Sequence, residues 1–402
     1  MKVTAFVVAL GLGSCALAPD EFASLRRNSF EWNQEERELG FLHFDKVFGG
    51  RNVPSGDAER PWKEGPPIQA FSEGGERQRQ LDEFLADQKV AGLLVAVDGE
   101  IRLERYALGH GREGRWTSQS VAKSVTSTLV GAAIQDGFIQ GVDDKLTTYI
   151  PDLEGSGYDG VTVGQLLTMS TGVRWVEDYT NPNSDLIKFF RRPVDRGVDQ
   201  TVSYLRSLPA DAEPGTRWLY STGETHLLGV LVSSATGQSL SDYLAAKIWR
   251  PYGMEHDATW TLNATGQELA GCCLHMGLRD AARFAQLVLD GGRIDGEPIV
   301  QDGWFEAATR SHFPVWGPLG YGYQWWTYTD GTFRALGIHG QTIHIDPARR
   351  LVVVLSSAWP EAENFERRTA DSVFINAVAA EVDLERGSGE PGRSATRSSA
   401  VM

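Results

Sequence analysis

The chain has 402 residues, of which 41% are hydrophobic, and its formal net charge is −15 at pH 7. This length and apolar content suffice for one large domain or two closely packed ones. The acidic excess repels phosphate and argues against sequence-independent nucleic-acid binding. We therefore expect a globular protein that does not bind nucleic acid.

The N-terminus has the pattern of a bacterial export signal. An apolar run that is too short to span a bilayer follows Lys2. Ala-Leu-Ala at 16–18 fits a small-residue cleavage site, whereas Leu-Gly-Ser-Cys ending at Cys15 resembles a lipobox. An uncleaved N-terminus is the alternative. We expect residues 1–18 to direct export to the periplasm, and a lipidated Cys15 would be the one membrane attachment.

The other two cysteines, Cys272 and Cys273, are adjacent. A disulfide between neighbours closes a strained ring, so we expect both to be small buried packing residues. Three cysteines make no disulfide framework, and no C-x-x-C or H-E-x-x-H pattern indicates a metal. No metal and no cofactor are expected.

The first predicted elements come before residue 120. Residues 19–74 are irregular and rich in Gly, Pro and charge, which predicts an extended segment that wraps a surface. An amphipathic helix is expected over 76–89. The two apolar runs that follow flank Asp98-Gly99, and this pattern predicts a β-hairpin.

The rest of the chain changes from helical to strand patterns. Helices ended by glycine are predicted in the segments that begin at Ser120, Gly223, Ser239 and Gly277. After about residue 315 short apolar runs alternate with turns, which predicts strands. A last helix is expected over 364–382, before a Gly/Ser/Arg-rich tail.

Strands at both ends with helices between them predict an α+β fold. One antiparallel sheet, built from both termini and flanked by helices, would carry a helical insertion. We expect residues 75–119 and 291–385 to form the sheet domain, 120–290 the mainly helical domain and 386–402 a disordered tail. Pockets commonly form in the cleft that such a body leaves between sheet and helices.

The strongest candidate chemistry is a serine three residues before a lysine. Ser120 and Lys123 stand at the expected start of a helix, and no other lysine has a serine at that spacing. One helical turn places both side chains on one face. The helix N-terminus offers N–H groups to an oxyanion, and a desolvated lysine can act as general base. An N-capping serine and a solvated lysine are the alternative.

Two later stretches could complete such a site. Tyr220 precedes a predicted helix, and a phenol held near an ammonium can relay a proton. An aromatic residue that packs on the core is the alternative. Gly337 and Gly340 allow close backbone approach, so an N–H of that stretch could complete an oxyanion hole. A bulge or turn is the alternative there.

The ordered combination of these three motifs resembles the serine β-lactamase and penicillin-binding-protein superfamily. It is most similar to class C β-lactamase-like esterases and peptidases. Within that group the segments SVAKSVTSTLVG, LLTMSTGVRWVEDYTNP and GIHGQTIHIDP resemble the 6-aminohexanoate-dimer hydrolase branch. The resemblance spans about residues 75 to 385 and implies a β-lactamase/transpeptidase-like fold.

The resemblance also implies roles for single residues. Ser120 would be the nucleophile, Lys123 its base and Tyr220 a proton relay. The N–H groups of Ser120 and Ile338 would form the oxyanion hole. The residues that it places against the substrate are Tyr179, Thr222, Gly337 and His339.

Two positions depart from the family pattern. Ala335 stands where β-lactamases and peptidases carry a cation for the substrate carboxylate, and Thr222 replaces an amide that contacts β-lactam side chains. Both departures favour small esters or amides, as in a carboxylesterase or a 6-aminohexanoate-oligomer amidase. The alternatives are a β-lactamase or D,D-carboxypeptidase, a sensor that is acylated without turnover, and a structural envelope protein. The oligomeric state does not follow from the sequence.

Overall fold

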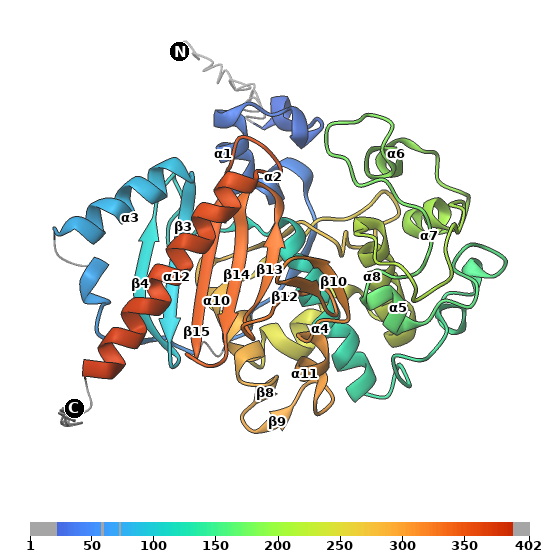
Figure 1. The fold of residues 1–402 in the computed structure, drawn as a ribbon. Coiled ribbons are helices and arrows are strands. Elements are labelled where there is room, and N and C mark those ends of the chain that lie inside the picture. The colour runs from blue at the N-terminus through green and yellow to red at the C-terminus, as the bar shows by residue number, and fades with distance from the viewer. Residues whose placement is uncertain (1–21, 58–59, 72–73, 389–402) are drawn as a thin grey trace, which may run out of the picture.

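The computed structural model describes residues 22–57, 60–71 and 74–388, and Figure 1 shows their arrangement. The predicted export signal, with Cys15, lies outside these residues. The helices are α1 Gln34–Leu42, α2 Phe44–Phe48, α3 Glu76–Asp87, α4 Ala122–Gln135, α5 Val163–Leu167, α6 Asp185–Arg191, α7 Gln200–Leu205, α8 Thr222–Thr236, α9 Leu240–Leu244, α10 Leu278–Leu289, α11 Trp304–Ala308 and α12 Phe365–Ser388. The strands are β1 Arg51–Val53, β2 Lys63–Glu64, β3 Val90–Val97, β4 Glu100–Tyr106, β5 Trp116–Thr117, β6 Ala258–Trp260, β7 Leu274–Met276, β8 Arg293–Ile294, β9 Glu297–Pro298, β10 Phe313–Trp316, β11 Leu319–Tyr321, β12 Trp326–Tyr328, β13 Phe333–Gly337, β14 Gln341–Asp346 and β15 Leu351–Ser357.

The main sheet is built from both ends of the chain, as the sequence predicts. Its strand order is β10-β11-β12-β13-β14-β15-β3-β4-β2, so the C-terminal β15 pairs with the N-terminal β3. The pairing is antiparallel except at the edge, where β2 runs parallel to β4. The predicted hairpin joins β3 to β4, and both Asp98 (φ 51°) and Gly99 (φ 78°) take the positive φ of a type I′ turn.

Alternate residues of the central strands face two different cores. Val353 and Leu355 of β15 pack with α3 and α12 on one face of the sheet. Val352 and Val354 belong to the larger core, which includes α4, α8 and α10. Figure 1 shows α12 and α3 in front of the sheet and α10 behind it. The helix α10, which the sequence assigns to the helical domain, therefore lies against the sheet.

Two terminal predictions need correction. The segment 19–74, predicted to be extended, contains α1 and α2. Asn33 and Glu36 form a capping box at the start of α1, and this Asn-x-x-Glu pattern is the local signal that the prediction missed. The last helix continues to Ser388, into the tail predicted to be disordered from residue 386. Residues 389–402 lie outside the described residues.

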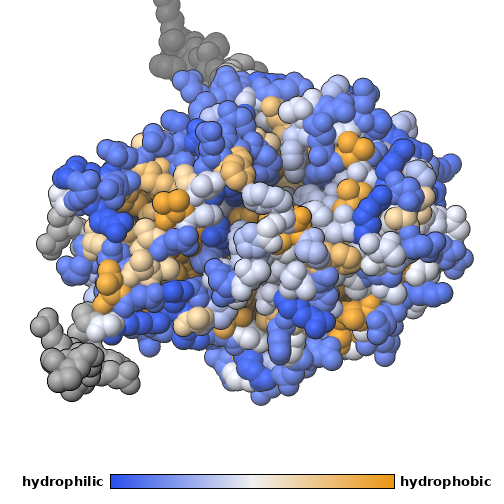
Figure 2. All heavy atoms as spheres, viewed as in Figure 1, coloured by the Kyte–Doolittle hydropathy of each residue, from blue (hydrophilic) through white to orange (hydrophobic). Residues whose placement is uncertain are grey.

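The surface seen in Figure 2 is mainly hydrophilic, and its apolar residues gather most over the side that carries α3 and α12. Among the described residues, no helix combines the length and the apolar character needed to cross a bilayer.

Candidate active site

Ser120 lies where the chain enters α4. It is 8% exposed and belongs to a short 3₁₀ turn, Gln119–Val121, that leads into the helix. The preceding residue, Gln119, has φ 45°, which is unfavourable for a residue with a side chain and costs roughly 1–3 kcal/mol. Backbone N–H groups in a first helical turn have no partner within the helix. At the start of α4, the hydroxyl of Ser120 and its backbone N–H are therefore both available for contacts outside the helix.

Lys123 is almost fully buried, one turn after the serine. Its Nζ donates to the Oγ of Ser120 (3.1 Å), the Oγ1 of Thr222 (3.0 Å) and the carbonyl of Gly271 (2.6 Å). Burial lowers the pKa of Lys123 to about 8. A neutral amine has two N–H donors, which Thr222 and Gly271 can accept, and one lone pair. That lone pair is then left for the proton of the Ser120 hydroxyl.

Glu177 determines how Thr222 is oriented. The hydroxyl of Thr222 donates to Glu177 Oε1 (2.5 Å), and the backbone N–H of Thr222 donates to Oε2 (3.0 Å). Because the threonine proton is directed to Glu177, its oxygen can only accept from Lys123. The indole of Trp175 and the phenol of Tyr179 also donate to this carboxylate. Thr222 thus links the carboxylate of Glu177 to Lys123 through two hydrogen bonds.

Removing this charge should alter the pH dependence of the site. Glu177 raises the pKa of Lys123, against the stronger effect of burial. Glu177→Gln should therefore lower the pKa of Lys123 and move the acid limb of the kcat/KM profile to lower pH. The control is Asp178→Asn. It removes the charge of the neighbouring residue, whose carboxylate accepts the N–H groups of Thr180 and Asn181 and not that of Thr222. A limb that stays in place or moves upward in Glu177→Gln would contradict this arrangement.

His226 supports the other partner of the lysine. Its Nδ1 accepts the N–H of Gly271 (3.0 Å), the residue whose carbonyl binds Lys123. Burial, together with the nearby lysine, lowers the pKa of His226 to about 3, so the ring is neutral. Because the ring is neutral, its Nδ1 can accept the N–H of Gly271, and His226 thereby holds Gly271 in place.

Tyr220 lies beside the serine and lysine. Its ring centroid is 5.3 Å from Lys123 Nζ, and the ring stacks on Trp326 at 5.7 Å. Burial raises the pKa of Tyr220, and a hydrogen bond with Ser120 opposes this effect. The phenol therefore keeps its proton at neutral pH, whereas Lys123 is close to losing its own. Near neutral pH Lys123 is therefore the group that can become a free base, whereas Tyr220 holds a proton that it could relay.

The end of β13 meets the turn before Ser120. A Cβ on Gly337 would lie 2.9 Å from the carbonyl oxygen of Ser118, so the glycine permits this close approach. The β13–β14 pairing ends at Gly337 and Gln341, and Ile338 follows as the first residue of the connecting turn. Ile338 and Ser120 line the same cavity. An oxyanion hole made of their N–H groups would require both residues to border one cavity.

The predicted substrate-binding residues do not all face that cavity. Tyr179 and Thr222 line it. Gly337 instead packs against the turn before Ser120. His339 is 4% exposed, its Nδ1 lies 2.8 Å from the carbonyl of Trp359, and its ring contacts Phe41. Among the described residues, His339 therefore supports the turn after Ile338 and does not line the cavity.

The cavity has a volume of about 410 Å³, which is the size of a small-molecule site. The N-terminal segment supplies one wall, including Phe30 and Phe44, and the α6 region supplies another, including Leu186 and Phe190. Figure 1 shows α1 and α2 between the sheet and the α6 region. The segment predicted to wrap a surface therefore contributes directly to the site.

The adjacent cysteines also form part of the wall, and the prediction that they are separate packing residues is wrong. Cys272 and Cys273 form a disulfide, and both line the cavity. Cys273 has φ 68°, a left-handed backbone conformation that residues with a side chain seldom adopt. The pair follows Gly271 directly and thus borders the loop that binds Lys123.

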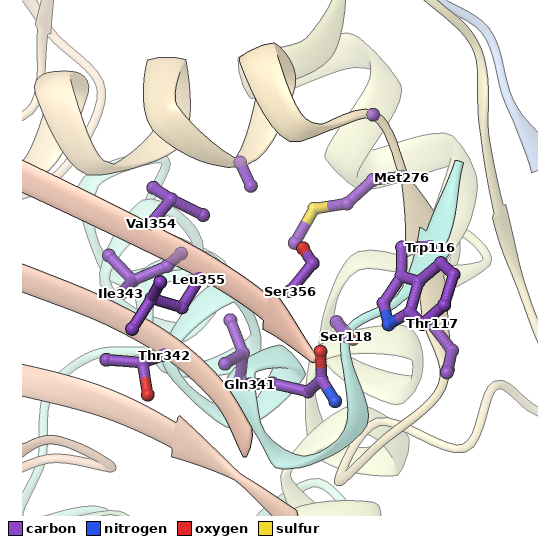
Figure 3. Close-up of a pocket in the computed structure, with 13 residues that line it drawn as sticks. Trp116, Thr117, Ser118, Met276, Gln341, Thr342, Ile343, Val354, Leu355 and Ser356 are labelled. Atoms are coloured by element: carbon purple, nitrogen blue, oxygen red, sulfur yellow. The ribbon is translucent and has the colours of Figure 1, made fainter. Parts of the chain in front are cut away.

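A second, much smaller pocket lies against the chain just before Ser120, where Trp116 and Ser118 line it (Figure 3). Its volume is about 20 Å³, which is room for about one water molecule and too small for a substrate. Gln341 reaches into it, and the amide of Gln341 donates to the carbonyls of Ser357 (2.7 Å) and His339 (3.2 Å). These bonds tie the turn that carries Ile338 to β15.

Comparison with known families decides the classification. The family model described as Beta-lactamase matches residues 77–375, which is most of the chain. The chain belongs to the beta-lactamase family. This confirms the resemblance seen in the three ordered motifs.

Relatives within the beta-lactamase family differ in how much they share with this chain. It is 30% identical over 333 residues to a 6-aminohexanoate-dimer hydrolase of Paenarthrobacter ureafaciens, an alignment that covers 78% of this chain and 84% of that protein. It is 28% identical over 193 residues to a beta-lactamase of Escherichia coli K12, with coverage of 45% and 46%. The predicted likeness to the aminohexanoate branch is therefore supported over most of the chain.

Solved structures of beta-lactamase relatives confirm the fold class. A putative 6-aminohexanoate-dimer hydrolase from Bacillus anthracis matches with a TM-score of 0.74 and 25% identity, covering 87% of this chain and 94% of that one. A class C beta-lactamase matches with a TM-score of 0.55 at 15% identity, covering 79% and 96%. The second likeness concerns the fold alone.

Proposed function

We propose that the protein is a serine hydrolase that forms a covalent acyl-enzyme with small esters or amides. The observation that carries the proposal is the buried contact between Lys123 Nζ and Ser120 Oγ at 3.1 Å, with the pKa of Lys123 lowered to about 8. Neutral lysine takes the serine proton, and the Oγ attacks the carbonyl carbon. The N–H groups of Ser120 and Ile338 hold the oxyanion.

Tyr220 completes the proposed cycle. Because its pKa is raised, the phenol carries a proton that it can pass to the leaving alcohol or amine. Lys123 returns the serine proton to Tyr220 as the leaving group departs. Water then attacks the acyl-enzyme with the same groups in the same roles, which releases the acid and restores Ser120.

A substrate panel tests the proposal. We expect steady-state hydrolysis of short p-nitrophenyl esters, of linear aminohexanoate amides, or of both. Hydrolysis of a chromogenic cephalosporin or a D-Ala-D-Ala peptide in preference to these would favour the β-lactamase or D,D-carboxypeptidase alternative. Stoichiometric acylation without steady-state product would instead support the sensor alternative. Absence of both would contradict the proposal.

Ala335 supports esters and amides over β-lactams. It is 1% exposed and belongs to the apolar core, so β13 carries no cation at the position where relatives hold a carboxylate. Charge at the cavity comes from elsewhere: Arg27 and Arg191 are the charged lining residues in the described chain. Arg27 pairs with Glu36 at 2.7 Å, whereas the guanidinium of Arg191 has no ion pair or hydrogen bond among the described residues.

This charge distribution predicts that the enzyme selects among substrates by the charge at the end of the acyl chain. No carboxylate lines the cavity in the described chain, so an ester whose chain ends in carboxylate should be hydrolysed with higher kcat/KM than its ammonium-ended counterpart. The measurement is kcat/KM for p-nitrophenyl esters of equal length ending in methyl, carboxylate or ammonium. Arg191→Gln should reduce the difference, and Arg192→Gln, whose side chain bonds Ser207, serves as control. Preference for the ammonium end would contradict this prediction.

We further propose that the protein is exported, on the basis of the apolar run after Lys2. Cell fractionation with N-terminal sequencing tests this. A mature chain that begins after residue 18 would indicate ordinary cleavage, and a lipidated Cys15 would indicate anchoring. Retention of residues 1–18 in the cytosol would contradict export.

A further inference from the structure

We infer that Arg368 is a positioning residue for the oxyanion hole, because its guanidinium binds the far side of the peptide whose N–H faces the reacting carbonyl. Arg368 Nη2 donates to the carbonyl oxygen of Gly337. That carbonyl and the N–H of Ile338 belong to one peptide group. The inference rests on the proposed function, since Ile338 is the oxyanion donor proposed there.

Three further contacts fix the guanidinium in place. Arg368 Nη1 donates to Thr342 Oγ1 at 3.2 Å, and the guanidinium carbon lies 4.6 Å from the ring centroid of Trp359. Arg368 Nε also lies 3.9 Å from Glu363. The side chain is only 19% exposed. Thr342 and Trp359 together hold the planar guanidinium in one orientation. It can therefore meet the carbonyl of Gly337 from one direction, which orients the plane of that peptide.

The bond also makes the opposite N–H a better donor. A cation on the carbonyl oxygen draws electron density from the amide nitrogen, so the N–H becomes more polar. Hydrogen bonds that share one peptide strengthen each other by roughly 10–30% per bond. Oxyanion stabilisation depends on donors that are oriented before charge develops. Arg368 supplies both effects without contact with the substrate.

The location of Arg368 indicates that this contact is not incidental. It lies in the first turn of α12, where the positive end of the helix disfavours a cation. Its charge also reaches the site, since Arg368 lowers the pKa of Tyr220 against the larger effect of burial. The adjacent Arg367 instead donates to the carbonyl of Asp87. The two neighbouring arginines therefore provide a matched pair for experiment.

The test compares Arg368→Gln with Arg367→Gln in the full-length protein. Kinetics with a p-nitrophenyl ester give kcat and KM, and difference infrared spectroscopy with a ¹³C=O-labelled ester gives the carbonyl stretch of the acyl-enzyme. Removing a whole oxyanion donor costs about 10²–10³-fold in kcat, so losing its polarising partner should cost roughly tenfold. We expect this loss with KM nearly unchanged and the acyl carbonyl stretch moved to higher wavenumber.

The infrared band separates positioning from a merely structural role. In Arg367→Gln, kcat and the band should match the wild type. In Arg368→Gln, an unchanged kcat, or a lower kcat with an unmoved band, would overturn the inference. If Arg368→Gln does not fold, Arg368→Lys takes its place, because one ammonium cannot reproduce the planar fork. A smaller shift in the same direction is then expected, and no shift would overturn the inference. A wild type without any acyl-enzyme band would contradict the proposed function itself.

Discussion

Ser120→Ala should lower kcat by about 10⁴-fold or more while the protein stays folded. The hydroxyl is the proposed nucleophile, and no neighbouring side chain on its turn can replace it. Removing a nucleophile leaves only the catalysis due to binding and the oxyanion hole. The measurement is steady-state turnover of a p-nitrophenyl ester, with thermal unfolding recorded to confirm the fold.

Ser127→Ala is the matched control for this loss. Ser127 lies on the same helix and is fully buried, and its hydroxyl has no hydrogen-bond partner among the described residues. We expect this variant to keep near-wild-type kcat. Turnover by Ser120→Ala within tenfold of the wild type would remove Ser120 from the nucleophile role.

Lys123→Ala should be almost as damaging as Ser120→Ala, because a nucleophile and its base act as a unit. The wild-type pH profile offers an independent test of the same role. A general base works only when it is deprotonated, and the pKa of Lys123 is lowered to about 8. We therefore expect kcat/KM to rise with pH, to reach half its maximum near pH 8, and to fall about tenfold per unit below that.

Lys247→Ala is a suitable control for the lysine, because Lys247 pairs with Asp136 outside the cavity. It should change neither kcat nor the pH profile. A Lys123→Ala enzyme that kept most of its rate would contradict the base assignment. A wild-type kcat/KM that falls as pH rises through 8 would contradict it as well, since that slope requires a protonated group.

Local patterns were enough to predict the parts of the fold that depend on nearby residues. The hairpin at Asp98-Gly99 follows from two positions that tolerate positive φ between apolar runs. The helix after Ser120 follows from apolar spacing and ends before Gly137, which has φ 79°. Ser120 and Lys123 lie one turn apart, so their contact is also a local consequence of the helix.

The features that the sequence missed depend on contacts between distant segments. Glu177 gains its role because a loop brings it to Thr222, and no spacing rule connects the two. Arg368 reaches Gly337 only after α12 has packed on the sheet. The disulfide between Cys272 and Cys273 depends on a backbone conformation that composition does not reveal. Tertiary packing creates the contacts of Glu177 and Arg368, whereas the disulfide joins adjacent residues and depends on a backbone conformation that residue types alone do not specify.

The central claim is that Ser120 becomes covalently acylated, and one labelling measurement tests it most directly. The full chain is treated with a fluorophosphonate probe, digested, and mapped by mass spectrometry, with Ser120→Ala in parallel. The account predicts a single adduct on the peptide that contains Ser120 and none in the variant. An adduct on another residue, or no adduct on a protein that hydrolyses esters, would contradict it.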